Sequence, residues 1–218
     1  MVAAGQGRRF GGEVGKQWVE VAGQALVDWS IALLLPVTER VIVAVPPEDL
    51  TAPPSRYADH RRVGWVAGGA SRWQSVRRAF DAIAGEAEDL VAVHDGARPA
   101  TAAEDVAAVI AAADRLGAAV LGRAASDTMK RVADERITST VEREELFGAE
   151  TPQVLRLELF ERCIGAAIEA GLDPTDESSA LELLGDVSIA AVEARHPNPK
   201  VTAPGDLELV RSLLAVRA

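Results

Sequence analysis

Residues 90–99 read LVAVHDGARP, and this stretch decides the class of fold. The apolar run at residues 90–94 is typical of a buried strand, and the glycine and proline behind it predict a loop. Thr101 and Glu104 then match a helix-capping box, so we expect a helix to begin there. Apolar side chains follow at helical spacing, at Val106, Val109, Ile110 and Ala113. Strand, loop and helix in succession form the repeating unit of α/β proteins.

The same alternation extends in both directions along the chain. Short apolar runs at residues 41–45, 118–121 and 187–192 predict further strands, and a helix is predicted behind a cap at Ser71. Its apolar positions are Val76, Ala79, Phe80 and Ile83. We therefore predict one α/β domain over residues 1–218, with a Rossmann-like, mostly parallel sheet flanked by helices. Ligands of such sheets bind beyond the carboxyl ends of the strands, so the loops there are the first candidates for function.

One segment departs from this alternation. Residues 126–140, SDTMKRVADERITST, place turn-forming residues between two strand-compatible runs. This pattern predicts a β-hairpin that projects from the sheet, and such hairpins often form oligomer contacts.

Composition excludes several classes of function. The chain has 218 residues, 48% of them hydrophobic, and a net charge of -10, which opposes a broad nucleic-acid-binding surface. Its one cysteine, Cys163, cannot form an internal disulfide, and no His/Cys spacing matches a zinc site. The start MVAAGQGRRF has no signal-peptide core, so we expect a cytoplasmic protein without membrane contact. Only residues 1–4 precede the first glycine, which favours a natural N-terminus upstream of Met1.

The N-terminal loop reads AAGQGRRFGG at residues 3–12, and Lys16 follows it. Gly5 and Gly7 allow backbone N–H groups to approach a phosphate closely, and Arg8, Arg9 and Lys16 add positive charge. The alternative is a flexible loop with solvated arginines.

Two better-known glycine motifs do not match this loop. Phe10 stands where a dinucleotide fingerprint needs its third glycine. In a Walker A alignment, Phe10 replaces the first glycine and Gln17 replaces the magnesium-binding hydroxyl.

Two further loops carry candidate ligand contacts. In HDGARP, Asp95 is suited to hold a ribose hydroxyl or Mg²⁺, and Arg98 to bind phosphate; the alternative is an Asp turn that caps the next helix. In GGASRWQS, Gly69 and Ser75 are suited to read the edge of a base, although Ser71 explains part of the motif as an ordinary cap. Surface or capping roles are the alternatives for the remaining polar candidates, which are Thr128, Lys130, Arg143, Thr151, Asp176 and Lys200.

Taken together, these segments resemble one known family. AAGQGRRF with Lys16-Gln17, GGASR with Ser75, HDGARP, DTMKR, TPQ, TDESSALE and KVT occur in the order found in 2-C-methyl-D-erythritol 4-phosphate cytidylyltransferases. The resemblance spans nearly the whole chain. It implies a nucleotidyltransferase fold whose hairpin arm, at about residues 126–143, reaches a second subunit.

The resemblance also implies the reaction: CMP passes from CTP to 2-C-methyl-D-erythritol 4-phosphate, with Mg²⁺ as cofactor, in the non-mevalonate isoprenoid pathway. By position, the cytidine would lie among Ala3, Ala4, Gly5, Gly69 and Ser75, and Gly7 would belong to the same nucleotide-binding loop. Arg9 and Lys16 would bind the triphosphate, and Asp95 would lie at the ribose and metal. The acceptor would face Arg98, Thr128, Arg143, Thr151 and Lys200, with Thr128 and Arg143 supplied by the partner of a homodimer. Arg9, Lys16 and Lys200 are the predicted catalytic residues.

Two positions depart from the family pattern, and two alternatives stay open. Gly15 stands where proline is usual, and Ala70 stands where an acidic or polar residue often follows the glycines. A cytidylyltransferase acting on ribitol 5-phosphate would share the CTP loops. A regulator that binds nucleotide without turnover is the alternative from another class, although it would not need an acceptor-phosphate site.

Overall fold

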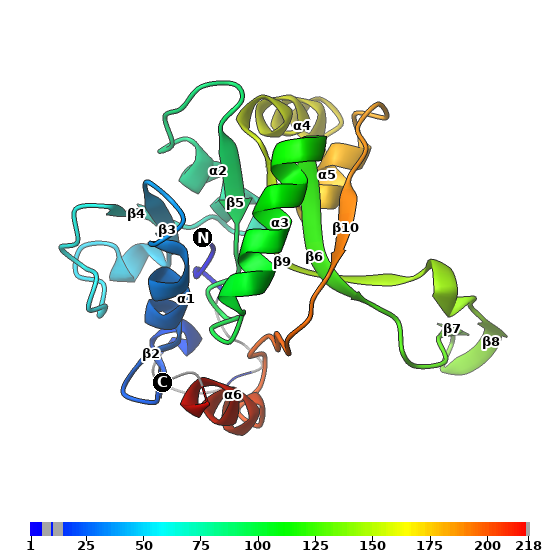
Figure 1. Cartoon of the computed structure of the whole chain (residues 1–218), viewed down its shortest axis with the longest axis horizontal. Coiled ribbons are helices and arrows are strands. Elements are labelled where there is room, and N and C mark those ends of the chain that lie inside the picture. Colours follow the sequence, from blue (N-terminus) through cyan, green and yellow to red (C-terminus); the bar gives the residue numbers. More distant parts are fainter. Residues whose placement is uncertain (6–9, 11–14, 217–218) are drawn as a thin grey trace.

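The repeated strand-loop-helix unit folds into a sheet with helices on both of its faces (Figure 1). The computed structural model describes residues 1–5, 10 and 15–216. Its strands are β1 (Glu20–Val21), β2 (Gln24–Ala25), β3 (Val41–Val45), β4 (Val63–Ala67), β5 (Leu90–Val93), β6 (Ala118–Ala124), β7 (Lys130–Ala133), β8 (Arg136–Thr140), β9 (Phe147–Arg156) and β10 (Ala190–Glu193). Its helices are α1 (Leu26–Leu34), α2 (Arg72–Phe80), α3 (Ala103–Leu116), α4 (Leu157–Glu169), α5 (Glu177–Glu182) and α6 (Asp206–Ala215), with short 3-10 turns at Lys16–Trp18, Pro47–Asp49 and Arg143–Glu145.

The sheet is mixed but mostly parallel, as predicted, because among its described strands only β9 runs against the others. β3 and β4 are parallel, and a second group has the order β10-β6-β9-β5. Val2 joins the two groups through parallel bridges to Ala44 and Asp95. β9 is antiparallel to both β6 and β5. The reason is the arm: the chain leaves β6, forms the hairpin and returns directly beside β6, and a return without a crossover reverses the strand direction.

Helices cover both faces because the central strands are apolar on both sides. Val43 of β3 belongs to one core cluster with Ile31 of α1, whereas its neighbour Ile42 packs with Ala79 of α2. Successive strand residues point to opposite faces, so α1 and α2 lie on opposite sides of the sheet. The predicted flanking by helices is confirmed.

Predicted strand boundaries are right to within a few residues. The strand at 41–45 is confirmed, and the one at 90–94 ends at Val93. The strand at 118–121 continues to Ala124 toward the arm, and β10 begins only at Ala190 rather than at residue 187.

The predicted helix starts have different outcomes. Ser71 caps α2 and accepts a hydrogen bond from Gln74 N, as predicted. The capping box at Thr101 is wrong: α3 begins at Ala103 without a side-chain cap. The Thr101 hydroxyl is buried and donates to Asn198 Oδ1 at 2.6 Å, so it binds a distant residue instead of capping the helix. None of the described helices combines the length and apolarity of a membrane span.

The predicted hairpin is present and projects away from the rest of the described chain (Figure 1). Asp134 and Glu135 form its two-residue turn, and both have positive φ angles, as a tight hairpin turn requires. Every residue of β7 and β8 is exposed.

Candidate active site

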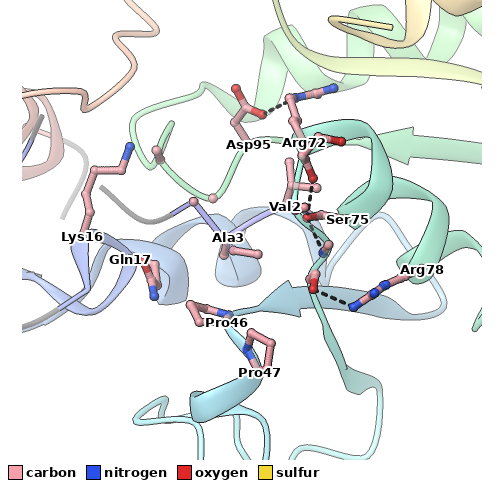
Figure 2. A pocket seen from close by; sticks show the side chains of 18 of the residues that line it. Val2, Ala3, Lys16, Gln17, Pro46, Pro47, Arg72, Ser75, Arg78 and Asp95 are labelled. Carbon is pink, nitrogen blue, oxygen red and sulfur yellow. Dashed lines mark hydrogen bonds and ion pairs between the residues drawn. The ribbon is translucent and has the colours of Figure 1, made fainter. Parts of the chain in front are cut away.

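A cavity of about 940 Å³ opens beyond the carboxyl ends of β3, β4 and β5. The loops that follow these strands line it, together with residues 2–5 and Lys200. Lys16 lies along its wall (Figure 2). This is the expected crevice of an α/β sheet. Small-molecule sites usually enclose roughly 300–1,000 Å³, so the cavity has room for a nucleotide and a second small substrate.

The loop after β4 is held in shape by side chains of α2. The Ser75 hydroxyl accepts a hydrogen bond from Gly69 N at 3.0 Å and donates to the Ser71 carbonyl at 2.9 Å. Arg78 Nη1 donates to the Gly68 carbonyl at 2.7 Å (Figure 2). These hydrogen bonds from α2 hold the backbone of the loop in one shape.

The two glycines of this loop are required by close packing. A side chain at Gly68 would collide with Ala4 of the N-terminal segment, and one at Gly69 would collide with Gln74. Only glycine allows the loop backbone to pack this closely against Ala4 and Gln74.

Asp95 has a basic partner on each of its carboxylate oxygens. Lys200 Nζ lies 2.6 Å from Oδ2, and Arg72 Nε lies 3.2 Å from Oδ1. Burial acts to raise the pKa of Asp95, but the charges of Arg72 and Lys200 outweigh burial and hold the pKa well below its usual range. Asp95 is therefore an anion at physiological pH.

Arg72 is held in turn by a second carboxylate. Its Nη1 and Nη2 donate to the two oxygens of Glu177 at 2.8 Å and 3.0 Å, and Glu177 is buried. Burial acts to lower the pKa of Arg72, but Glu177 and Asp95 together outweigh burial and raise the pKa above its usual value. Glu177, Arg72 and Asp95 thus form a line from the core to the cavity wall.

The backbone of Asp95 is supported from below. Its N–H donates to Thr151 Oγ1 at 3.1 Å, and that hydroxyl lies 3.2 Å from His94 Nδ1. His94 Nε2 lies 3.3 Å from the Arg98 carbonyl, which can only accept, so Nε2 carries the proton and Nδ1 accepts from Thr151. Burial lowers the pKa of His94 to about 4, so the imidazole is neutral and this chain of contacts is complete.

Arg98 lies behind the cavity rather than on its surface. Its Nη1 donates to the Asn198 carbonyl at 2.6 Å, while Nε is 4.0 Å from Asp95 Oδ2. Asn198 Nδ2 donates to the Thr151 carbonyl at 3.0 Å. These contacts connect the loop after β5 to the segment that carries Lys200.

Comparison with known proteins identifies the family. The family model for 2-C-methyl-D-erythritol 4-phosphate cytidylyltransferase (IspD) matches residues 1–215. The chain belongs to this cytidylyltransferase family.

Curated relatives and solved structures agree with the family match. The chain is 36% identical to the 2-C-methyl-D-erythritol 4-phosphate cytidylyltransferase of Syntrophotalea carbinolica, over 97% of this chain and 93% of the relative. It is 40% identical to that of Aeromonas hydrophila, over 95% and 85%. The crystal structure of the Thermus thermophilus enzyme matches with a TM-score of 0.82 and 32% identity, over 98% of this chain and 97% of that chain. The Francisella tularensis structure has a TM-score of 0.84 and 28% identity, with 97% of each chain covered.

The cavity brings together most of the residues that the cytidylyltransferase motifs assign to the nucleotide. Those that line it are Ala3, Ala4, Gly5, Lys16, Gly69, Ser75 and Asp95, and Lys200, which the motifs assign to the acceptor, lines it as well. Arg98 and Thr151 lie directly behind Asp95. Thr128 and Arg143 lie on the arm and are exposed. Gly7 and Arg9 lie outside the described residues.

Four charged residues at the site were not assigned a role from the sequence: Glu48, Arg72, Arg78 and Glu177. The sequence does carry a signal for Arg72 and Arg78, because both lie on α2, the helix that directly follows the Gly68-Gly69 loop. Glu177 follows the cap residue Asp176, but nothing in the sequence joins it to Arg72, which lies 105 residues earlier.

The cavity suits a magnesium ion that is carried mainly by its substrate. Asp95 and Glu48 contribute carboxylates to its lining. Among the residues that the structure describes, no three His, Cys, Asp or Glu side chains gather as a metal-binding group. Mg²⁺ commonly binds one or two carboxylates and completes its shell with phosphate oxygens and water, so this donor set matches a nucleotide-bound ion.

Proposed function

We propose that this chain transfers CMP from CTP to 2-C-methyl-D-erythritol 4-phosphate. An oxygen of the acceptor phosphate attacks the α-phosphorus of CTP, the bond to the bridging oxygen breaks, and pyrophosphate leaves. The observation that carries the proposal is the meeting of Lys16, Lys200 and Asp95 in one cavity of a family member. The whole chain has a net charge of -10, so these local cations supply the attraction that two polyanionic substrates need.

The nucleotide would lie along the N-terminal segment and the Gly68-Gly69 loop. The loop is preformed, so base binding would not need to order it. Lys16 would face the triphosphate, and its Nζ now donates to the Val201 carbonyl at 2.8 Å. We assign Arg9 to the leaving pyrophosphate on the family motif.

The acceptor phosphate would lie near Lys200, on the side of Asp95 where Arg98 and Thr151 support the wall. No covalent protein intermediate is needed, because positioning and charge stabilisation suffice for phosphoryl-type transfer. Asp95 would hold Mg²⁺ together with phosphate oxygens of CTP. The ion, when bound, neutralises charge that develops on those oxygens.

We also propose that the arm joins two copies of the chain. Met129, Val132 and Ile137 are 42%, 63% and 67% exposed, and Val132 and Ile137 are cross-strand partners. Such exposed apolar side chains on a projecting hairpin mark an interaction surface. A partner seated there would bring Thr128 and Arg143 into a defined environment.

We expect the enzyme to act in the cytoplasm, where CTP is available.

The test is pyrophosphate release with CTP and Mg²⁺, with 2-C-methyl-D-erythritol 4-phosphate or ribitol 5-phosphate supplied in parallel. Release with the first acceptor supports the proposal. Release with ribitol 5-phosphate alone would identify the alternative acceptor, ribitol 5-phosphate, as the substrate. CTP binding without release in either reaction would favour the nucleotide-binding regulator.

A further inference from the structure

We infer that Glu177 is a positioning residue that acts through Arg72 to orient the carboxylate of Asp95. This inference rests on the proposed function, because Asp95 is taken to meet the ribose and the metal-bound phosphates of CTP. Neither Arg72 nor Glu177 belongs to the residues assigned to the substrates above. Glu177 is fully buried, so it acts on the reaction only through Arg72.

The starts of two helices bring the pair together. Arg72 is the first residue of α2, behind the cap Ser71, and Glu177 is the first residue of α5, behind the cap Asp176. Ser71 Oγ also donates to Asp173 Oδ1 at 2.8 Å, which ties the two helix starts to each other. Caps fix where a helix begins, so both side chains leave the backbone at defined points.

The geometry of the guanidinium group then determines what reaches Asp95. Both terminal nitrogens of Arg72 are bound by Glu177, at 2.8 Å and 3.0 Å, and this two-point contact fixes the plane of the group. Nε is left to donate to Asp95 Oδ1 at 3.2 Å. Lys200 binds Oδ2 at 2.6 Å, so each oxygen of Asp95 has its own donor and the carboxylate is held in one orientation.

Glu177 also balances the charge next to the substrate. The negative charges of Glu177 and Asp95 are opposed by the positive charges of Arg72 and Lys200, so the net formal charge of the four groups is zero. Without Glu177, the terminal nitrogens of Arg72 would be free to take both oxygens of Asp95 or a phosphate of CTP. Either change would withdraw Asp95 from the role proposed for it. Residues that orient a ligand-binding group in this way typically contribute about 10- to 100-fold to affinity or activity.

A double-mutant cycle tests the inference. We expect Glu177→Gln, which keeps the side-chain size, to weaken Mg·CTP binding about tenfold by calorimetry without acceptor. In an Arg72→Met background the same change should have no further effect, because the route to Asp95 is already lost. Glu182→Gln on the exposed side of α5 is the matched control and should bind Mg·CTP like the wild type.

The outcomes separate positioning from simple stability. Wild-type affinity and kcat in Glu177→Gln, with only a lower Tm, would overturn the inference, as would an added loss in the Arg72→Met background. If Glu177→Gln fails to fold, Arg72→Lys provides the test. Lysine keeps the charge but lacks the planar fork that binds Glu177 at two points while Nε contacts Asp95, so Mg·CTP binding should still fall about tenfold. Turnover by the wild type is measured separately, so failure of the proposed reaction would not be mistaken for failure of this inference.

Discussion

The cavity wall around Asp95 and the hairpin arm hold their side chains in opposite ways. Around Asp95, the residues Glu177, Thr151 and His94 are buried and are bound by partners from distant segments. On the arm every residue of β7 and β8 is exposed, and contacts are local, such as Lys130 Nζ to Thr140 Oγ1 at 2.7 Å. Folding of one chain therefore organises the wall around Asp95, whereas the exposed side chains of the arm would be buried only in the proposed homodimer.

The largest effect that tests this contrast is expected at Lys16. Lys16→Ala should lower kcat roughly 10²- to 10³-fold, the usual loss when one well-placed charge-stabilising group is removed. Pyrophosphate release measures the effect, and Tm should change little. Arg211→Ala, which removes an exposed cation from α6, serves as the control. Near wild-type kcat in a folded Lys16→Ala enzyme would refute the catalytic assignment of this lysine.

Replacing threonine by valine at Thr151 and at Thr128 tests the two regions with the same chemical change. Thr151→Val keeps the shape of the side chain but leaves Asp95 N–H and His94 Nδ1 without their partner, so the free energy of unfolding should fall by about 1–3 kcal/mol. Thr128→Val on the exposed arm should change it by less than about 0.5 kcal/mol and reduce turnover instead. Urea denaturation and pyrophosphate release distinguish them. Equal stability losses in both variants would contradict the difference between wall and arm.

Local patterns predicted the parts of the molecule that local physics controls. The cap at Ser71, the hairpin and the hydrogen bond from Gly69 to Ser75 in the loop after β4 each depend on residues a few positions apart. Placement of the cavity followed from one topological rule, because loops at the carboxyl ends of parallel strands must meet at the same edge. Most of the predicted nucleotide residues line the cavity for that reason.

Long-range partners account for what local patterns missed. Thr101 matched a capping box, but Asn198 Oδ1, 97 residues later, binds its hydroxyl. Glu177 follows the cap Asp176 at the start of α5, and its pairing with Arg72 depends on how α2 and α5 pack. The antiparallel β9 follows from the direct return after the arm, which strand patterns alone do not reveal.

The next smaller effect is expected on the arm itself. Val132→Asp should raise the dissociation constant of a homodimer at least about tenfold, since an unpaired charge would be buried in the interface. Activity at low enzyme concentration should fall as the fraction of dimer falls. Ile168→Asp, at a 53% exposed position on α4, is the control for adding an acid elsewhere. Sedimentation velocity gives the assembly state, and a Val132→Asp enzyme that remains dimeric would show that the arm is not the contact.

The smallest effect is expected at Asp176, which fixes the start of α5 and therefore the position of Glu177. Asp176 accepts from Ser179 N at 2.9 Å and from Gln153 Nε2 at 2.8 Å. Asp176→Ala should lower the free energy of unfolding by about 1 kcal/mol at pH 7, the usual cost of losing a cap. Asp127→Ala, an exposed acid of the arm, should cost less than about 0.5 kcal/mol.

The pH dependence of this loss separates the charge of Asp176 from its cap. Burial acts to raise the pKa of Asp176, but hydrogen bonds from Gln153, Ser179 and Ser178 outweigh it and lower the pKa. A lowered pKa in the folded state gives stability that is complete well above the unfolded pKa of about 3.9 and is lost as pH falls through the folded pKa. The gap between wild type and Asp176→Ala should therefore narrow from pH 7 to pH 3 in urea denaturation. Asp176→Asn keeps a cap acceptor and should lose less at pH 7; a gap independent of pH would show that the carboxylate charge contributes nothing.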